Sequence, residues 1–597
     1  MAGLCSLIFV VAVEEGRIGH VRQRAQHLVD FYSPLNILSV AITELPRLSL
    51  VVGEYRFQPP GALSQRRHAP NRGTTASTQL KWGGPFPAWL DEEGLLTGSD
   101  ERLRTLDRTL AAFAAGPSSA RLVTGCAGAT SLYTARASET EAWSTHAVAA
   151  GYLAHGHVRL DPCALPQLFA AEFVGGTQTQ LADVTAVPRA TVVEFAPERY
   201  KTRAYWPERE RYAKLAAAEA FDAAERALIE SLDARLPSGQ RVELGLTAGA
   251  DSRVAAVALK KAERSFEAIT VAPESGSDDA RGAAVVARQI GIPHRIRGYE
   301  LQPDEKALDL INAEVRWSEG IAPLNGFAIG EAETSDLVVT GGGGEIARAW
   351  YYRWKARNYR HPRRRQLARV LSHLHWRIGG ASARAHELLD AAILRWLDAA
   401  FCTGHDGWAA LDVIYDEERL GRWGRARLHR SRAPLLYAFS TPTLTQAFLS
   451  LPLEDRISDG FHRQFLARHA PSLIVPRPPA QRRALPRSVR RLSAAVRHRR
   501  GLEDVPGDPL VAEMLRRRPR TREHIADDVL EREVLASVMG RAWLRRTRSA
   551  FLDGQQHAVD TAFLATSIIA LDTAISSLNA ASRTGSSSLP SDPTPDG

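Results

Sequence analysis

The sequence is poor in cysteine and has no metal-binding pattern built from cysteine and histidine. Its 597 residues include four cysteines. None of them forms a CxxC pair, and no His/Cys cluster has the spacing of a zinc site. The four are Cys5, Cys126, Cys163 and Cys402. These absences argue against a disulfide framework and favour a reducing compartment, so we expect a cytoplasmic protein.

The sequence also lacks the pattern of a signal peptide and a long, purely apolar segment. The N-terminal run MAGLCSLIFVVAVEEG has no basic residue before its apolar part, and acids follow it. A buried first strand is therefore favoured over a signal peptide. Near the C-terminus, TAFLATSIIALDTAISSL contains Asp572 and several hydroxyl residues. It is too polar and too short to predict a membrane span, and we expect no membrane partner.

Aromatic residues are scarce around the basic clusters of this chain. The formal net charge is +9, and arginine is concentrated at 363–365, 482–500 and 516–520. Such clusters occur in proteins that bind RNA or anionic substrates. With few aromatic residues between them, a solvated basic surface is favoured over a nucleic-acid partner. The hydrophobic content of 44% and charged content of 24% are typical of a globular chain with two to four domains.

Two patterns of elements divide the chain. Residues 1–205 contain short β-like runs separated by turn residues, namely SLIFVVAV, LSLVVGEY, RLVTG and TVVEF. An amphipathic helix is predicted over 212–236. Strand-like and helical segments then alternate, as VELGL, SRVAAVALKKAE, FEAITV, DDARGAAVVARQ, HRIRG, DEKALDLINAEVRW and DLVVT. This alternation predicts a parallel, doubly wound sheet.

The remainder of the chain reads as mainly helical from about 350 to 580, and 582–597 has the composition of a disordered tail. We therefore divide the chain at 1–205, 206–480, 481–581 and 582–597. We find no internal repeat.

The first loop of interest is TAGADS, which follows the strand VELGL. Ligands in open parallel sheets bind beyond the carboxyl ends of the strands. Ala248 and Gly249 leave the backbone N–H groups open to a phosphate, and the following helix adds positive potential. Thr247 and Ser252 can donate hydrogen bonds to phosphate oxygens, and Asp251 is a candidate magnesium ligand. The alternative is a tight turn in which Asp251 and Ser252 cap the helix.

The second loop, TGGGGE, follows the strand DLVVT. Four consecutive glycines cost backbone entropy, which favours a place where another group passes close; the alternative is a flexible loop. An acid follows here too, Glu345. Asp251 and Glu345 could converge on one magnesium ion bound to ATP phosphates. The chain has no GxxxxGK[ST] motif, which argues against a P-loop ATPase or kinase.

These loops resemble those of a known family. TAGADS resembles the SGGxDS pyrophosphate loop of the ATP pyrophosphatase superfamily. TGGGGE resembles the SGDGADE loop of asparagine synthetases and their relatives, the β-lactam synthetases and lasso peptide cyclases. AITVAPESGSDDARGAAVVARQIGIPH resembles that family's second strand and following helix. LVTGCAGATSLYTA, and TQTQLADVTAVPRATVVEF followed by YW, resemble parts of its N-terminal glutaminase domain. The similarity spans about 1–480 and is strongest over 240–350.

The resemblance implies a fold and a set of site residues. The fold would be α/β, an N-terminal Ntn-hydrolase-like α+β sandwich followed by a doubly wound ATP-pyrophosphatase domain with a helical C-terminal part. Asp251 and Glu345 would bind Mg²⁺, and Arg463 in GFHRQFL would replace a late family lysine. The residues in contact with ATP would be Leu246, Thr247, Gly249, Asp251, Ser252, Val271, Thr340 and Gly341.

The activity that the resemblance implies is ATP-dependent amide formation. A carboxylate, from a small molecule or a peptide, would attack the α-phosphorus to give an acyl-adenylate and pyrophosphate. An amine or ammonia would then displace AMP. This chemistry needs neutralised charge more than a protein nucleophile.

The chain departs from the family pattern at several positions. Ala2 stands where the glutaminases have a cysteine, and Cys5 cannot replace it because the nucleophile must carry the free α-amine. We therefore expect no glutaminase activity. Gly342 replaces an acid or tyrosine that helps to deprotonate the amine. Tyr351, Tyr352 and Glu319 are possible replacement bases, although such residues are more often core aromatics or surface acids.

Two other classes of function remain open at this point. One is a tRNA-modifying ATP pyrophosphatase, which shares the first loop and suits the positive charge. The other is a pseudoenzyme that binds a nucleotide or a partner, which suits the loss of the acid at Gly342. Retention of Asp251 and Glu345 favours the amide synthase.

Overall fold

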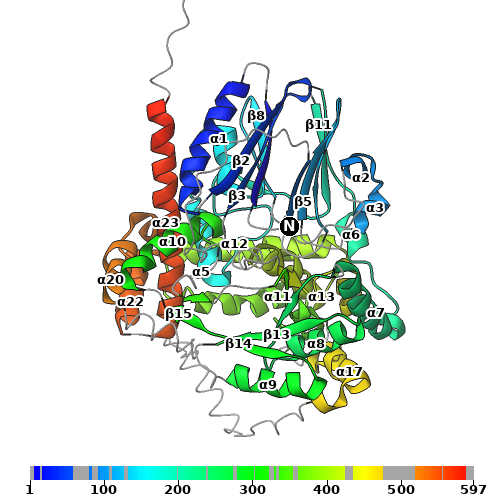
Figure 1. The fold of residues 1–597 in the computed structure, drawn as a ribbon. Coiled ribbons are helices and arrows are strands. Elements are labelled where there is room, and N and C mark those ends of the chain that lie inside the picture. The colour runs from blue at the N-terminus through cyan, green and yellow to red at the C-terminus, as the bar shows by residue number, and fades with distance from the viewer. Residues whose placement is uncertain are drawn as a thin grey trace, which may run out of the picture.

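The N-terminal part of the protein is a sandwich of two antiparallel sheets (Figure 1). The computed structural model describes residues 6–13, 17–35, 37–57, 79–83, 92–105, 110–126, 132–197, 199–236, 239–272, 278–301, 303–321, 328–330, 335–353, 356, 361–423, 435–474, 518–553 and 555–585. The first sheet has the order β2 (Ile37–Leu45), β3 (Leu50–Phe57), β1 (Ser6–Val13), β8 (Thr140–Ser144), β7 (Tyr133–Arg136), β9 (Thr185–Ala186). The second has the order β11 (Arg199–Ala204), β10 (Thr191–Ala196), β6 (Ala120–Thr124), β5 (Leu110–Ala115), β4 (Gln79–Gly83).

Strand β1 shows why its sequence is apolar at nearly every position. Ile8 and Val10 face the core between the two sheets, where Trp143 of β8 packs edge-on against Phe195 of β10 with ring centroids 5.3 Å apart. Residues on the other face of the same strand pack with helices α1 (Ile18–Tyr32) and α4 (Ala147–His155). A strand buried on both faces needs no polar alternation.

Helices also cover the outer face of the second sheet. Leu95 of α2 (Glu92–Thr97) and Leu103 of α3 (Asp100–Arg104) share an apolar cluster with Val123 of β6. The layers therefore run helix, sheet, sheet, helix, and the expectation of an N-terminal α+β sandwich is confirmed.

A five-stranded parallel sheet forms the second half of the fold. Its order is β14 (His294–Arg297), β13 (Phe266–Val271), β12 (Val242–Gly245), β17 (Leu337–Thr340), β18 (Leu435–Tyr437). Each pair is parallel. In chain order this is 3-2-1-4-5, the strand order of a doubly wound sheet. The expectation of such a sheet is confirmed, and the order reverses between β12 and β17.

Helices connect the strands as the alternation predicts. They are α8 (Ala250–Lys261), α9 (Asp278–Ile290) and α10 (Asp304–Ser318). Gly291, with φ +67°, follows the end of α9. This left-handed conformation suits glycine because it has no Cβ, so the predicted end of that helix is confirmed.

The helix predicted over 212–236 is shorter than expected. Residues 208–211 form a separate turn, α6 (Glu208–Arg211), and α7 begins only at Ala217 and ends at Arg235. Tyr212 lies between them because its buried hydroxyl shares its proton between the carboxylates of Asp416 and Glu417, 2.7 and 2.6 Å away. Tertiary anchoring of this side chain overrides the local helical pattern.

The described residues after 360 are mainly helical, as expected. The larger elements are α11 (Arg364–Leu371), α12 (Ala383–Cys402), α13 (Ala409–Ile414), the π-helix η7 (Tyr415–Trp423), α15 (Pro442–Ser450), α16 (Leu453–Ile457), α17 (Gly460–His469), α20 (Pro519–His524), α21 (Glu533–Met539), α22 (Arg541–Leu552) and α23 (Gln556–Gly585).

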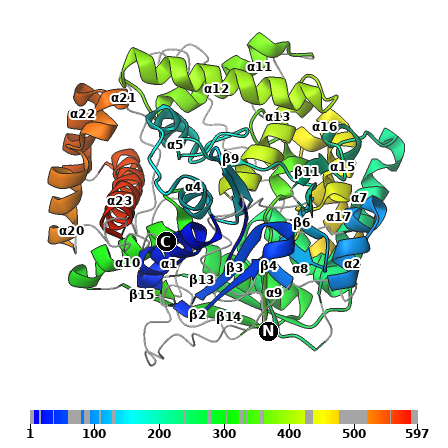
Figure 2. The same ribbon diagram turned by 90° about the horizontal axis from the view of Figure 1, so that it is seen from above.

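Helix α23 brings the end of the described chain back to the N-terminal sandwich. Figure 2 shows α20, α22 and α23 gathered on one side, next to α1 and α10. The side chain of Asn579 accepts a hydrogen bond from the N–H of Val158 and donates one to its carbonyl. The helix continues through 582–585, where the composition predicts the start of the tail; the rest of that tail lies outside the described residues.

One stretch of the described residues is long and apolar enough to cross a membrane by length and composition. It is Ala558–Ser582, and 72% of its most apolar window is buried inside the molecule. Most of this helix is therefore packed against the rest of the molecule. Its hydroxyl residues, such as Thr566, bond to carbonyls of the helix itself.

Candidate functional site

The two loops singled out in the sequence lie side by side at the point where the sheet reverses its order. β12 and β17 are hydrogen-bonded neighbours. TAGADS follows the first strand and TGGGGE follows the second, so both lie at the carboxyl edge of the sheet. This is the place where ligands bind in open α/β sheets.

Asp251 packs directly against the glycine loop. A Cβ on Gly341 would lie 2.9 Å from the Cβ of Asp251, and one on Gly344 would lie 2.3 Å from its Oδ1. Gly343 has φ +92°, a left-handed conformation that suits glycine. The run of glycines therefore meets a steric requirement, because any side chain at 341 or 344 would displace Asp251.

Hydroxyl groups hold the first loop in shape. Ser252 Oγ accepts a hydrogen bond from the N–H of Thr247 at 3.2 Å, and Thr247 Oγ1 accepts one from the N–H of Gly249 at 3.0 Å. Helix α8 begins after Gly249 without a side-chain cap. Asp251 is turned toward the second loop, so it does not cap the helix as the alternative interpretation of this loop required.

Both carboxylate oxygens of Asp251 contact nitrogen atoms of basic side chains. His462 Nε2 lies 2.8 Å from Oδ1, and Arg348 Nη2 lies 2.6 Å from Oδ2. Burial alone would raise the pKa of Asp251, but the hydrogen bond and charge of His462 and the charge of Arg348 outweigh it and lower that pKa. We call Asp251, His462 and Arg348 the aspartate clamp.

The pKa of Glu345 is shifted in the opposite direction from that of Asp251. Burial, followed by repulsion from Asp251, raises the pKa of Glu345. Its Oε2 is buried and has no hydrogen-bond partner among the described residues. Tyr415 donates a hydrogen bond to the carboxylate, and burial together with the charge of Glu345 holds the pKa of Tyr415 well above its usual value. Tyr415 is therefore a donor here and not a base.

These two acids fit a divalent cation. A buried carboxylate oxygen without a partner, beside a second carboxylate, is a site where Mg²⁺ would relieve both the desolvation and the repulsion. Within the described residues no group of three His, Cys, Asp or Glu side chains converges on one point. The ion would therefore be held by Asp251, Glu345 and oxygens of its ligand, with Arg348 or His462 releasing one Asp251 oxygen.

A cleft of about 590 Å³ opens above the two loops. Its described lining includes Glu345 and every residue that the resemblance implied for ATP contact, which are Leu246, Thr247, Gly249, Asp251, Ser252, Val271, Thr340 and Gly341. Val271, at 61% exposure, stands at its mouth. This volume is within the range of small-molecule sites.

The far wall of the cleft comes from residues that the sequence did not single out. They are Leu435 and Tyr437 of β18, with Tyr415 and Leu420 of η7. A Cβ on Gly342 would lie 2.2 Å from the ring of Tyr437. That ring therefore fills the space into which a side chain at position 342 would project.

The structure corrects the expected placement of Arg463. Its side chain is exposed on α17 and does not line the cleft, whereas the preceding residue, His462, is buried against Asp251. Successive residues of a helix point about 100° apart, so only one of the two can face the site. Burial of Phe461 and Phe465 on the same helix is the pattern that would have favoured His462.

The suggested replacement bases also lie elsewhere. Glu319 accepts hydrogen bonds from the N–H groups of Ala147 and Val148 at the start of α4. Tyr352 is buried, stacked on Trp408 and bonded to Asp412. Neither lines the cleft, and Tyr351 does not line it either.

Part of the N-terminal resemblance falls outside the described residues. Residues 1–5 include Ala2 and Cys5, and residues 127–131 belong to the LVTGCAGATSLYTA segment. The flanks of that segment are β6, which ends at Thr124, and β7, which begins at Tyr133.

The known structures compared with this chain below are distant from it in sequence. No protein-family model matches the chain, and no curated protein is significantly similar to it. A solved structure described as the allosteric regulatory enzyme of purine biosynthesis is 11% identical, covers 62% of this chain and 78% of its own, and has a TM-score of 0.22. Glutamine phosphoribosylpyrophosphate amidotransferase from B. subtilis, complexed with ADP and GMP, is 12% identical, covers 50% and 66%, and has a TM-score of 0.20. At such low values neither likeness bears on the activity of this chain.

Proposed function

We propose that this protein is an ATP-dependent amide synthase that forms AMP and pyrophosphate, similar to asparagine synthetases. The carboxylate oxygen of the substrate would bond to the α-phosphorus of ATP while the bond to the bridging oxygen breaks, and pyrophosphate would leave with that electron pair. The amine would then attack the acyl carbon, lose a proton and release AMP. The carboxylate comes from a small molecule or a peptide, as in a lasso peptide cyclase, and the nitrogen comes from ammonia or an amine of the substrate.

One observation carries this proposal. The TAGADS and TGGGGE loops meet at the reversal point of a parallel sheet, with Asp251 in contact with Gly341 and Gly344. A turn with no ligand has no need of a buried carboxylate oxygen without a partner, such as Glu345 Oε2, beside Asp251.

Each group in the cleft has a role in this reaction. The loop around Gly249 would receive the pyrophosphate through backbone N–H groups and the N-terminus of α8. Leu246 and Val271 would flank the adenine. Once Asp251 binds the cation, His462 and Arg348 would exchange their contacts with Asp251 for contacts with the phosphates. Mg²⁺, when bound between Asp251 and Glu345, would neutralise charge on the phosphates.

Pyrophosphate exchange tests the proposal directly. Purified protein is incubated with ATP, Mg²⁺, labelled pyrophosphate and pools of carboxylic acids or peptides, and label returning to ATP is measured. We expect exchange that depends on one pool and is lost in Asp251→Asn and Glu345→Gln. Arg364→Gln is a matched control, because Arg364 forms an exposed ion pair with Asp398 on α12, away from the cleft. Exchange that persists in both cleft variants would contradict the assignment.

The aspartate clamp favours a second candidate, a protein that binds nucleotide without turnover. Arg348 and His462 already contact the two oxygens of Asp251, so ATP could bind without the metal geometry that adenylation needs. In that case ATP binds with an affinity independent of Mg²⁺, and no pool supports exchange. Magnesium-dependent ATP binding in isothermal titration calorimetry would rule this second candidate out.

A further inference from the structure

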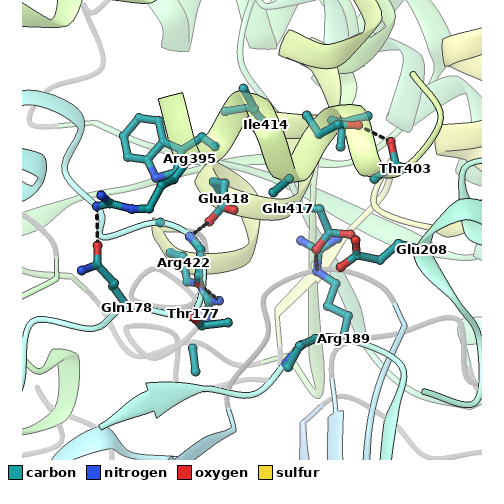
Figure 3. A pocket seen from close by; sticks show the side chains of 18 residues that line it. Thr177, Gln178, Arg189, Glu208, Arg395, Thr403, Ile414, Glu417, Glu418 and Arg422 are labelled. Carbon is teal, nitrogen blue, oxygen red and sulfur yellow. Dashed lines mark hydrogen bonds and ion pairs between the residues drawn. The ribbon is translucent and has the colours of Figure 1, made fainter. Parts of the chain in front are cut away.

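A second cavity lies at the junction between the N-terminal sandwich and the helical part. Its volume is about 310 Å³, and we call it the junction cavity (Figure 3). Residues 175–189 supply one side, and α12, α13 and η7 supply the other. The cleft and the junction cavity share η7 as a wall, since Tyr415 and Leu420 line the first and Glu417, Glu418 and Arg422 line the second. π-Helical turns are rare and occur often at functional sites.

One end of the junction cavity is apolar. Trp396 of α12 lines it together with Ala399, Val413 and Ile414. The backbone of Gly175 packs on the Trp396 ring so closely that a Cβ would lie 2.3 Å from Nε1. This surface suits an aliphatic or aromatic group.

Oppositely charged groups meet at the other end. Glu418 and Arg422 are four residues apart on η7, and both bind the backbone of Gly176. Glu418 accepts a hydrogen bond from the N–H of Gly176 at 2.6 Å, and Arg422 Nη2 donates one to its carbonyl at 2.7 Å. Figure 3 shows Arg395 to one side of this pair and Glu208 with Glu417 to the other.

The cationic side of this arrangement has unused hydrogen-bonding capacity. Nε and Nη1 of Arg422 are buried and have no acceptor among the described residues. Arg395 is exposed and donates a hydrogen bond to Gln178 Oε1 at 2.8 Å, and its guanidinium carries five N–H donors in all.

The acidic side would gain from a cation. Burial, and then the charge of Glu417, raise the pKa of Glu418. Partial burial and the charge of Glu417 also raise the pKa of Glu208, whose side chain is 45% exposed. Glu417 itself is already paired with Arg211 and Arg189. Glu418 and Glu208 are therefore the carboxylates that an ammonium group would stabilise.

We propose that the junction cavity binds an α-amino acid with an apolar side chain. Its carboxylate would pair with Arg422 and Arg395, its ammonium group with Glu418 and Glu208, and its side chain would pack on Trp396. The site is separate from the nucleotide cleft, and the proposal does not depend on amide synthesis.

Binding to the full-length protein tests this assignment. Isothermal titration calorimetry without ATP is carried out with L-leucine, L-phenylalanine and L-valine. For the tightest of them, the corresponding amine without the carboxylate and the corresponding acid without the amine serve as single-charge probes. We expect saturable binding of at least one amino acid, and binding weaker by roughly tenfold or more for each single-charge probe, because each lacks one charge-assisted contact.

A cavity-filling variant locates the site. Ala399 is exposed on α12 and lines the junction cavity, so Ala399→Trp adds bulk there without entering the core. Ala391, exposed on the same helix and outside the cavity lining, gives the matched control Ala391→Trp. We expect Ala399→Trp to lose amino-acid binding while Ala391→Trp keeps it, with ATP affinity unchanged in both.

Three results would overturn the proposal. They are no saturable binding of any of the three amino acids to the wild-type protein, equal binding by Ala399→Trp, or single-charge probes that bind as tightly as the amino acid. None of these results changes the expected outcome of pyrophosphate exchange in the cleft, so this inference and the proposed function fail independently.

Discussion

A methyl group at Gly344 should disable the cleft while leaving most of the fold intact. In Gly344→Ala the new Cβ would lie 2.3 Å from Oδ1 and 2.7 Å from Cγ of Asp251. Both distances are far inside van der Waals contact, so one of the two groups must move. Asp251 is the end of a short side chain, and turning it away is the easier adjustment. That turn breaks its contacts with His462 and Arg348.

The magnitude follows from what Asp251 loses. Overpacking of a close contact costs about 1–3 kcal/mol. Losing a hydrogen bond to a charged partner costs on the order of 1.5–3 kcal/mol. If Asp251 also holds the cation of bound ATP, the affinity for ATP with Mg²⁺ should fall roughly 10- to 100-fold, at about 1.4 kcal/mol for each factor of ten.

Calorimetric titration with ATP and Mg²⁺, together with denaturant unfolding, measures the two effects. Gly19→Ala is the matched control, because Gly19 lies in α1 and no atom lies within 4 Å of the place that its Cβ would take. This control should be neutral or more stable by about 0.4–1 kcal/mol, since alanine restricts the unfolded chain. If Gly344→Ala keeps wild-type stability and wild-type ATP affinity, then position 344 does not need to be glycine to make room for Asp251, and our reasoning is refuted.

Three further predictions concern individual side chains. Glu345→Gln removes the repulsion from Asp251, so it should leave unfolding stability equal or higher while abolishing the magnesium dependence of ATP binding. His462→Ala should weaken ATP binding, whereas Arg463→Ala should change stability by no more than about 0.5 kcal/mol and leave ATP binding unaltered, because Arg463 is exposed; equal effects in the two would contradict the placement of α17. The pKa of Glu417 is lowered from 4.5 to about 2, so its contribution to stability is present above pH 4.5 and is lost as the pH falls toward 2. Urea unfolding from pH 6 to pH 2 should show this acid loss in the wild type and a smaller one in Glu417→Gln.

The parallel sheet and its loops could be predicted because their signals are local. FEAITV becomes β13 at the predicted residues, and DDARGAAVVARQ becomes α9 with Gly291 after its end. Apolar runs of strand length, separated by helices with their own end signals, leave few alternative topologies. The carboxyl ends of adjacent strands then have to share one edge of the sheet, which brought Asp251 and Glu345 together.

Contacts between distant segments could not be predicted in this way. His462 and Arg348 reach Asp251 from 211 and 97 residues away along the chain, and no local pattern encodes such a pairing. The choice between His462 and Arg463 depends on which face of α17 is buried. In the same way, Tyr212 lies outside the helix because its hydroxyl bonds to the carboxylate of Asp416, about two hundred residues later in the chain.

The sequence by itself determined the alternation of strands and helices, the parallel sheet and the two glycine-rich loops at its edge, since these depend on hydrophobic period and on the backbone freedom of glycine. Only the tertiary structure decided which charges neutralise Asp251, that Tyr437 fills the space above Gly342, and that a cavity with both signs of charge lies at the junction of the two halves. These features depend on the packing of segments that are far apart in the chain, where distance and burial set the energy of each charge.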